Sequence, residues 1–153
     1  MASTIQDSKL VVKISESVIL NGKEQGGVTT KILSGINTYS KRIVTLIEDT
    51  SHSVAEFVAS SLIASDLEYD SDKLQYIRMT NLDDTNKVII TYVSAAGNAA
   101  LAVRAGGSTL LFSKEANGSS AGDSGLTSTS RMTNLVIRPV GGNVDVEIVI
   151  ATT

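Results

Sequence analysis

The chain has no cysteine, and this absence excludes several kinds of structure and chemistry at once. Disulfide bridges, zinc sites with thiolate ligands and nucleophilic thiols all require that residue. The 153 residues also include no tryptophan, a single histidine and a single proline. Few rings are therefore left to stack on sugars or bases, and proline interrupts few of the segments that could form strands.

Neither positive nor negative charge is in large excess. Thirteen basic residues stand against sixteen acidic ones, and no cluster of lysine and arginine provides the basic surface that nucleic-acid binding needs. The first twenty residues lack the basic region and the continuous apolar core of a signal peptide. No apolar run approaches the roughly twenty residues of a membrane helix. We therefore expect a soluble protein with no nucleic-acid or membrane partner.

The apolar residues that are present favour β-structure. Hydrophobic residues make up 42% of the chain but aromatics only 4%, so the remainder is rich in valine and isoleucine, which suit strands. Val144, Val146, Ile148 and Ile150 alternate with other residues, as in a strand with one buried face. The stretch Gln75–Phe112 contains several such runs between turn residues and predicts an antiparallel meander.

Together these signals predict an all-β fold, an antiparallel β-sandwich of jelly-roll or Greek-key type with roughly eight to ten short strands. Residues 1–8 are expected to form a polar N-terminal arm, and residues 9–153 a single sandwich domain. Within that domain, 113–130 is rich in glycine and serine and predicts a long surface loop. Residues 50–61 are expected to form a strand, and 62–73 an acidic connection without one.

Candidate catalytic and metal-binding residues all have simpler interpretations. His52, the only histidine, has no nucleophile motif to serve and is expected to be an exposed polar residue at a loop or strand edge. Carboxylates at every second position superficially resemble a calcium loop, but the required glycine and the closing glutamate are missing. A solvated acidic loop, with an opportunistic surface cation as the alternative, is the better interpretation of that run: Asp66, Glu68, Asp70 and Asp72.

The remaining polar and glycine-rich segments predict turns. Asp83, Asp84 and Asn86 suit side chains that cap a tight turn. Neither 106–108 nor 118–125 has the pattern of a phosphate-binding loop. Two further features, the repeated string RMTNL at 78–82 and 131–135 and the four scattered tyrosines, indicate neither a repeat architecture nor a stacking platform. We therefore predict no catalytic, cofactor-binding or metal-binding residue, and a protein that is not an enzyme.

Three phrases of the sequence resemble a group of bacteriophage virion proteins. Residues 76–86 (YIRMTNLDDTN) are similar to their phrase YIRITNLD-TN, and 101–112 to their step K-L-x-A-G-x-S-F. The ending 144–151 (VDVEIVIA) is similar to their terminal strand VDVEIFIA. Gly35-Ile36-Asn37 and 42–45 extend the likeness toward the N-terminus, whereas 99–104 and 113–130 depart from the pattern.

The resemblance implies a β-sandwich built into a virus particle, with no catalytic residues to carry over. It suggests a capsid decoration or cement protein that is made in the host cytoplasm and binds the major capsid protein or another virion protein. By the same analogy it would act as a homo-oligomer, with a trimer as the specific expectation. The alternatives are a tail, neck or fibre component, or a receptor- or carbohydrate-binding module.

Overall fold

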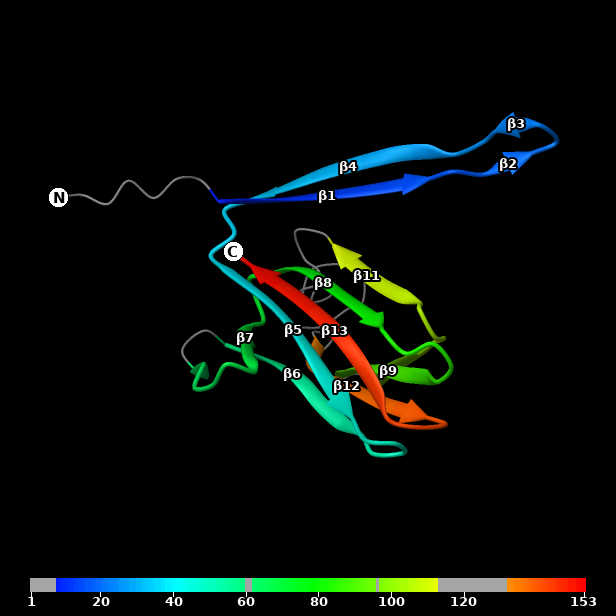
Figure 1. The fold of residues 1–153 in the computed structure, drawn as a ribbon. Helices are drawn as coiled ribbons and strands as arrows, with labels where there is room; N and C mark the ends of the chain where they lie inside the picture. Colours follow the sequence, from blue (N-terminus) through cyan, green and yellow to red (C-terminus); the bar gives the residue numbers. More distant parts are fainter. Residues whose placement is uncertain (1–7, 60–61, 96, 113–131) are drawn as a thin grey trace.

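The computed structural model describes residues 8–59, 62–95, 97–112 and 132–153. Within these ranges the chain forms thirteen β-strands and no α-helix (Figure 1). Roughly eight to ten strands were expected, and the three beyond that number have only two or three residues each. In chain order the strands are β1 (Lys9–Glu16), β2 (Ile19–Leu20), β3 (Lys23–Glu24), β4 (Gly27–Ser34), β5 (Thr38–Leu46), β6 (His52–Val58), β7 (Glu68–Asp70), β8 (Leu74–Asn81), β9 (Lys87–Ser94), β10 (Gly97–Val103), β11 (Ser108–Phe112), β12 (Met132–Val140) and β13 (Val144–Thr152).

The two larger sheets form a sandwich with the strand order of a jelly roll. One sheet runs β11-β8-β13-β5 and the other β10-β9-β12-β6-β7. The pairs β5·β13, β6·β12, β8·β11 and β9·β10 are nested in chain order, as when one long hairpin is folded over on itself. This nesting is the jelly-roll arrangement, to which β7 is added as a parallel edge strand beside β6. The predicted all-β sandwich is confirmed.

The stretch Gln75–Phe112 contains β8 to β11, but it is not a meander. β8 pairs with β11 and β13, whereas β9 pairs with β10 and β12. The turn signals at 82–86 and 104–107 therefore mark crossings from one sheet to the other, and the predicted pairing was wrong. Alternating residues show which face of a strand is buried, but they do not show which strand lies beside it.

The main core lies between the two sheets. The inward side chains of β8, β9, β12 and β13 are almost completely buried there, among them Ile77, Ile90, Ile137 and Ile148. Burial of this kind is worth about 1.5–3 kcal/mol for each large aliphatic side chain and drives the sheets together. Among the described residues, no helix has the length and apolar character needed to cross a membrane.

A β-hairpin stands apart from the sandwich. β1 and β4 form a sheet of their own, continued outward by the short pair β2·β3 (Figure 1). The base of this hairpin packs on the outer face of the β11-β8-β13-β5 sheet, where Val12 and Leu33 join Tyr76 and Val149 in a second buried cluster. A two-stranded hairpin is marginal in water, so this cluster holds it in place.

Two predicted segments lie mostly or wholly outside the described residues. Of the expected arm 1–8 only Ser8 is described, and its carbonyl accepts hydrogen bonds from the amides of Gly35 (2.8 Å) and Ile36 (3.3 Å) at the hairpin base. The expected loop 113–130 is outside them entirely. The predicted strand within 50–61 is confirmed as β6, whereas the connection 62–73 contains β7, which was missed.

Candidate functional site

The hairpin formed by residues 9–34, called the hairpin arm from here on, extends well beyond the sandwich (Figure 1). Ile14 is the outermost residue of β1 that packs on the second cluster. From there to Asn21 at the tip is a span of about 23 Å at the rise of an extended strand. Near the tip, Ile19 is 73% exposed and Leu20 59% exposed. The arm thus carries large apolar side chains into solvent.

The outer face of the arm is apolar at its centre and basic at its ends. Val11 and Ile32 are cross-strand partners, and both are at least half exposed. Because side chains alternate along a strand, this pair lies on the face opposite the buried Val12 and Leu33. Lys9 and Lys13 lie on the same face and are exposed.

A carboxylate clasp shapes the tip. Glu24 accepts hydrogen bonds from the amides of Val18 (3.0 Å) and Gly26 (2.9 Å) and from the hydroxyl of Ser17 (3.2 Å). The Gly26 amide, and after it the Val18 amide, lowers the pKa of the Glu24 carboxyl below its ordinary value. The two-residue turn Asn21-Gly22, with φ of 51° and 74°, closes the hairpin as its sequence predicts.

The same region requires glycine at one position. A Cβ added to Gly26 would lie 2.0 Å from the carbonyl oxygen of Glu16, which is backbone and cannot swing away. A Cβ on the neighbouring Gly27 would meet nothing within 4 Å. Gly26 therefore lets the chain pass close to the backbone of Glu16, the last residue of β1.

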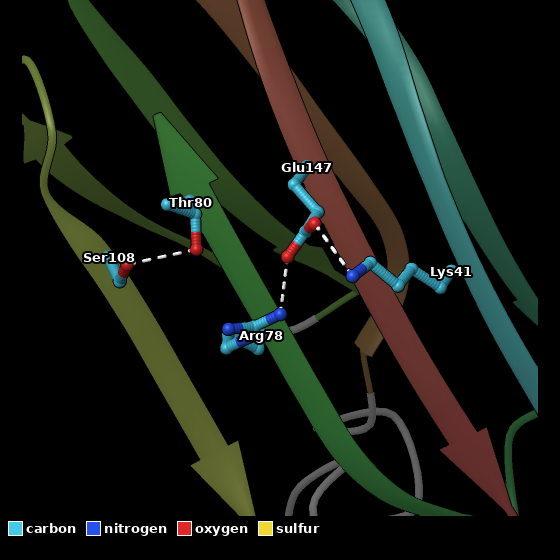
Figure 2. A network of polar contacts seen from close by, with 5 residues as sticks. All are labelled: Lys41, Arg78, Thr80, Ser108 and Glu147. Carbon is cyan, nitrogen blue, oxygen red and sulfur yellow. Dashed lines mark hydrogen bonds and ion pairs between the residues drawn. The ribbon is translucent and has the colours of Figure 1, made fainter. Parts of the chain in front are cut away.

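An ionic network crosses the outer face of the sheet below the arm (Figure 2). Glu147 on β13 lies between Arg78 on β8 and Lys41 on β5, with the Lys41 Nζ 3.1 Å from its Oε2. Beside it, the hydroxyls of Thr80 on β8 and Ser108 on β11 form a hydrogen bond at 2.9 Å. The Glu147 side chain is only 15% exposed, so these contacts neutralise a carboxylate that is mostly shielded from water. The network ties three strands together, with the Glu147 carboxylate bound to a cation on each side.

A groove of about 750 Å³ opens between the start of β5 and β7. Its β7 side carries three carboxylates, those of Asp66, Glu68 and Asp70. Its apolar lining includes Ile63 and Tyr39, which are 46% and 56% exposed. The groove is therefore acidic on one side and open to an apolar side chain.

The basic residues of the groove are already occupied. Lys41 binds Glu147, and the Arg42 guanidinium donates a hydrogen bond to the carbonyl of Val54. The positive charges of Lys41 and Arg42 therefore balance only part of the negative charge of the three carboxylates. An incoming basic segment would therefore find acceptors in the groove.

His52 lies at the end of a strand, as predicted, but it is partly buried rather than exposed. It is the first residue of β6, and its Nε2 accepts a hydrogen bond from the Ile47 amide at 3.0 Å across the β5–β6 turn. The imidazole thus closes a turn, and no hydroxyl or thiol nucleophile is among its hydrogen-bond partners in the described part of the chain.

The acidic run at 66–72 is divided between a turn and a strand. Glu68 and Asp70 belong to β7, and each uses a carboxylate oxygen to accept a backbone amide, that of Ala64 and that of Asp72. Within the ranges that the structure describes, no group of three or more histidine, cysteine or acidic side chains is arranged to hold a metal ion. The carboxylates shape the loop that forms one wall of the groove.

The predicted turn at 83–86 is confirmed. The Asp83 carboxylate accepts hydrogen bonds from the amides of Asn86 and Thr85, the latter at 2.7 Å, and these bonds lower the pKa of Asp83. Gly106 and Gly107 likewise form a corner, with φ of 69° at Gly106. The other glycine-rich candidate, 118–125, lies outside the described residues.

Sequence reasoning missed Asn81, the buried polar residue that organises this turn. Its Oδ1 accepts the Asp83 amide at 3.0 Å, and its Nδ2 donates to the carbonyls of Asn86 (2.9 Å) and Val103 (3.3 Å). The sequence did contain a signal for this role: Asn81 continues the alternation of β8 on its inward face, where the preceding positions are occupied by apolar residues. The structure assigns it a role in the fold.

No protein-family model, curated protein or solved structure matches this chain.

Proposed function

We propose that this protein is a structural component of a bacteriophage particle, specifically a capsid decoration or cement protein that stabilises the shell by bridging capsid subunits. The observation that carries the proposal is the hairpin arm, a segment that projects from the sandwich and exposes Ile19 and Leu20 (Figure 1). Exposed apolar surface of this kind marks a contact with another molecule.

Two further observations support a structural role. The jelly roll is a fold of viral capsid domains and also of lectins, an analogy at the level of fold alone. The polar clusters of the described residues are engaged in turns, strand edges and the Glu147 network rather than gathered around a reactive group. The same surfaces fit a homo-oligomer, for which we propose a trimer that contacts the major capsid protein.

The proposed mechanism is adhesive. Each arm adds a modest contact across a subunit boundary, so separating neighbouring capsid subunits costs more free energy when the boundary is bridged. Repetition of that contact over a closed shell multiplies the effect, because a released arm remains at high effective concentration near its site.

The experiment is to image particles with and without this protein and to heat both. We expect density on the capsid surface to disappear and the shells to rupture at a lower temperature when the protein is missing. Adding back the purified protein should restore both properties, whereas adding the variant with Leu20 replaced by aspartate should not. An intact, equally heat-stable shell with altered tails would instead identify a tail, neck or fibre component.

A carbohydrate-binding role is the less supported alternative. All six aromatic residues are described, and Tyr39 is the exposed one among them. One ring at the groove offers little stacking surface for a sugar. Glycan binding by the purified protein that Tyr39→Ala abolishes would favour this role over the structural one.

A further inference from the structure

We propose that the hairpin arm of one copy docks in the β5–β7 groove of a second copy, so that the chain assembles head to tail into a closed ring. The inference rests on the oligomer proposed above, but it names the two surfaces that make the junction. The arm and the groove lie on different parts of the molecule, and neither is self-complementary, so the contact is heterologous.

The charges of the two surfaces are complementary. Residues 8–35, which contain the arm, carry four lysines against two glutamates, whereas residues 36–153 carry nine basic residues against thirteen acidic ones. One of those glutamates, Glu24, is bound to backbone amides at the tip. The arm therefore presents mostly lysine, and the groove is lined by Asp66, Glu68 and Asp70, of which Glu68 and Asp70 each also accept one backbone amide. Opposite charge of this kind steers association and sets its register.

The apolar parts match as well. Ile19 and Leu20 project from the arm near Lys23, while Ile63 and Tyr39 line the groove next to its carboxylates. An apolar contact with a charged rim is the usual composition of a protein interface. Docking would cover exposed side chains on both partners.

An arm cannot reach the groove of its own chain. The tip formed by β2 and β3 points away from the body, and β7 lies on the opposite side of the sandwich (Figure 1). The base of the arm is held by Val12 and Leu33 in the second cluster, so it does not swing freely. The occupant must come from a neighbouring copy, and each copy then offers one arm and one groove.

The first measurement is the mass of the purified full chain in solution, by light scattering or native mass spectrometry. The wild-type protein should be a closed oligomer, and Leu20→Asp should be monomeric. Ile47→Asp is the matched control, because Ile47 is 60% exposed and lies at the far end of β5 from the groove. It should assemble like the wild type, and thermal unfolding should show that both variants are folded.

The second measurement mixes an arm variant with a groove variant. Asp66→Lys should also be monomeric, because it replaces an acceptor in the groove with a like charge. In an equimolar mixture with Leu20→Asp, one intact arm meets one intact groove, so a dimer containing one copy of each should appear and growth should stop there. Assembly of Asp66→Lys alone would show that the arm binds another surface and would overturn the assignment.

The absence of cysteine allows a direct check of contact. A mixture of two single variants, Leu20→Cys and Ile63→Cys, should form a disulfide between copies under oxidation, whereas Ile47→Cys with Ile63→Cys should not. A wild-type chain that stays monomeric at its highest soluble concentration would contradict the proposal that the arm docks in the groove of a second copy. Because every measurement uses pure protein, such a failure leaves the role on the particle to be decided separately by imaging.

Discussion

At the scale of single residues, the polar side chains of this protein build its turns. Asn81, Asp83 and Glu24 each bind two or more backbone or hydroxyl groups. Asn81 differs from the other two because it is almost completely buried, at 1% exposure. Loss of a buried hydrogen-bonding group leaves its former partners unsatisfied. The free-energy cost of those unpaired buried groups exceeds the net free energy that the hydrogen bonds contribute to folding.

We expect Asn81→Ala to lower the free energy of unfolding by about 2–3 kcal/mol, since the Asp83 amide and the carbonyls of Asn86 and Val103 lose their partner. Urea denaturation followed by circular dichroism measures this change. Asn98→Ala is the matched control on exposed β10 and should change the free energy by no more than about 0.5 kcal/mol. Equal effects of the two substitutions would contradict the role given to Asn81.

Glu24 should make the arm tip sensitive to acid. Its carboxylate accepts backbone amides only in the folded hairpin, which places the folded pKa below the ordinary value of 4.5. The stabilisation is therefore complete above 4.5 and is lost as the pH falls through the lowered folded value. In an NMR titration the amide protons of Val18 and Gly26 should shift together with a midpoint below 4.5.

The control for this titration is Glu24→Gln, which keeps the size of the side chain but cannot ionise. Its Val18 and Gly26 amides should show no shift in the same pH range. A wild-type midpoint at or above 4.5 would mean that the carboxylate is not held by these amides.

At the scale of elements, the sequence predicts what depends on near neighbours in the chain. The period of two in 144–150 identifies β13, and Asn21-Gly22 identifies the turn of the hairpin, because each signal is complete within a few residues. Most longer strands could be located in this way. The acidic strand β7 could not, since only Tyr69 of its three residues is buried.

What could not be predicted is which elements pair and which surfaces meet. The alternation in 10–14 is the same whether the strand belongs to the sandwich or to a separate hairpin, because it reports one buried face and not what covers it. The groove cannot be predicted for the same reason: Thr38–Arg42 begin a strand of one sheet, whereas 63–70 lead into the edge strand β7 of the other, so the two segments meet only when the sheets pack together. The arm and groove therefore become visible only in three dimensions.

At the scale of the whole molecule, the base of the hairpin arm contributes to the fold, and its tip is the part for which we propose a role in assembly. The base of the arm covers Tyr76, Val149 and their neighbours on the outer sheet face, so it belongs to the folded core. Among the described residues, Ile19 and Leu20 of the tip are exposed and belong to neither buried cluster. This separation lets a small protein keep an exposed apolar segment without weakening its fold.

The separation can be measured by truncating one side chain in each part. Leu33→Ala should lower the free energy of unfolding by about 2–4 kcal/mol, because Leu33 is 3% exposed and leaves a cavity against the outer sheet face. Ile19→Ala removes a side chain of the same size from the solvent-exposed tip, so it should change that free energy by no more than about 0.5 kcal/mol. The two substitutions should have the opposite relative effects on assembly, measured as the oligomeric mass under native conditions. Ile19→Ala should weaken the proposed contact between copies. Leu33→Ala should leave that contact intact as long as the chain is folded. If Ile19→Ala instead destabilised the monomer, the tip would be part of the core, and its exposure could not be attributed to a partner.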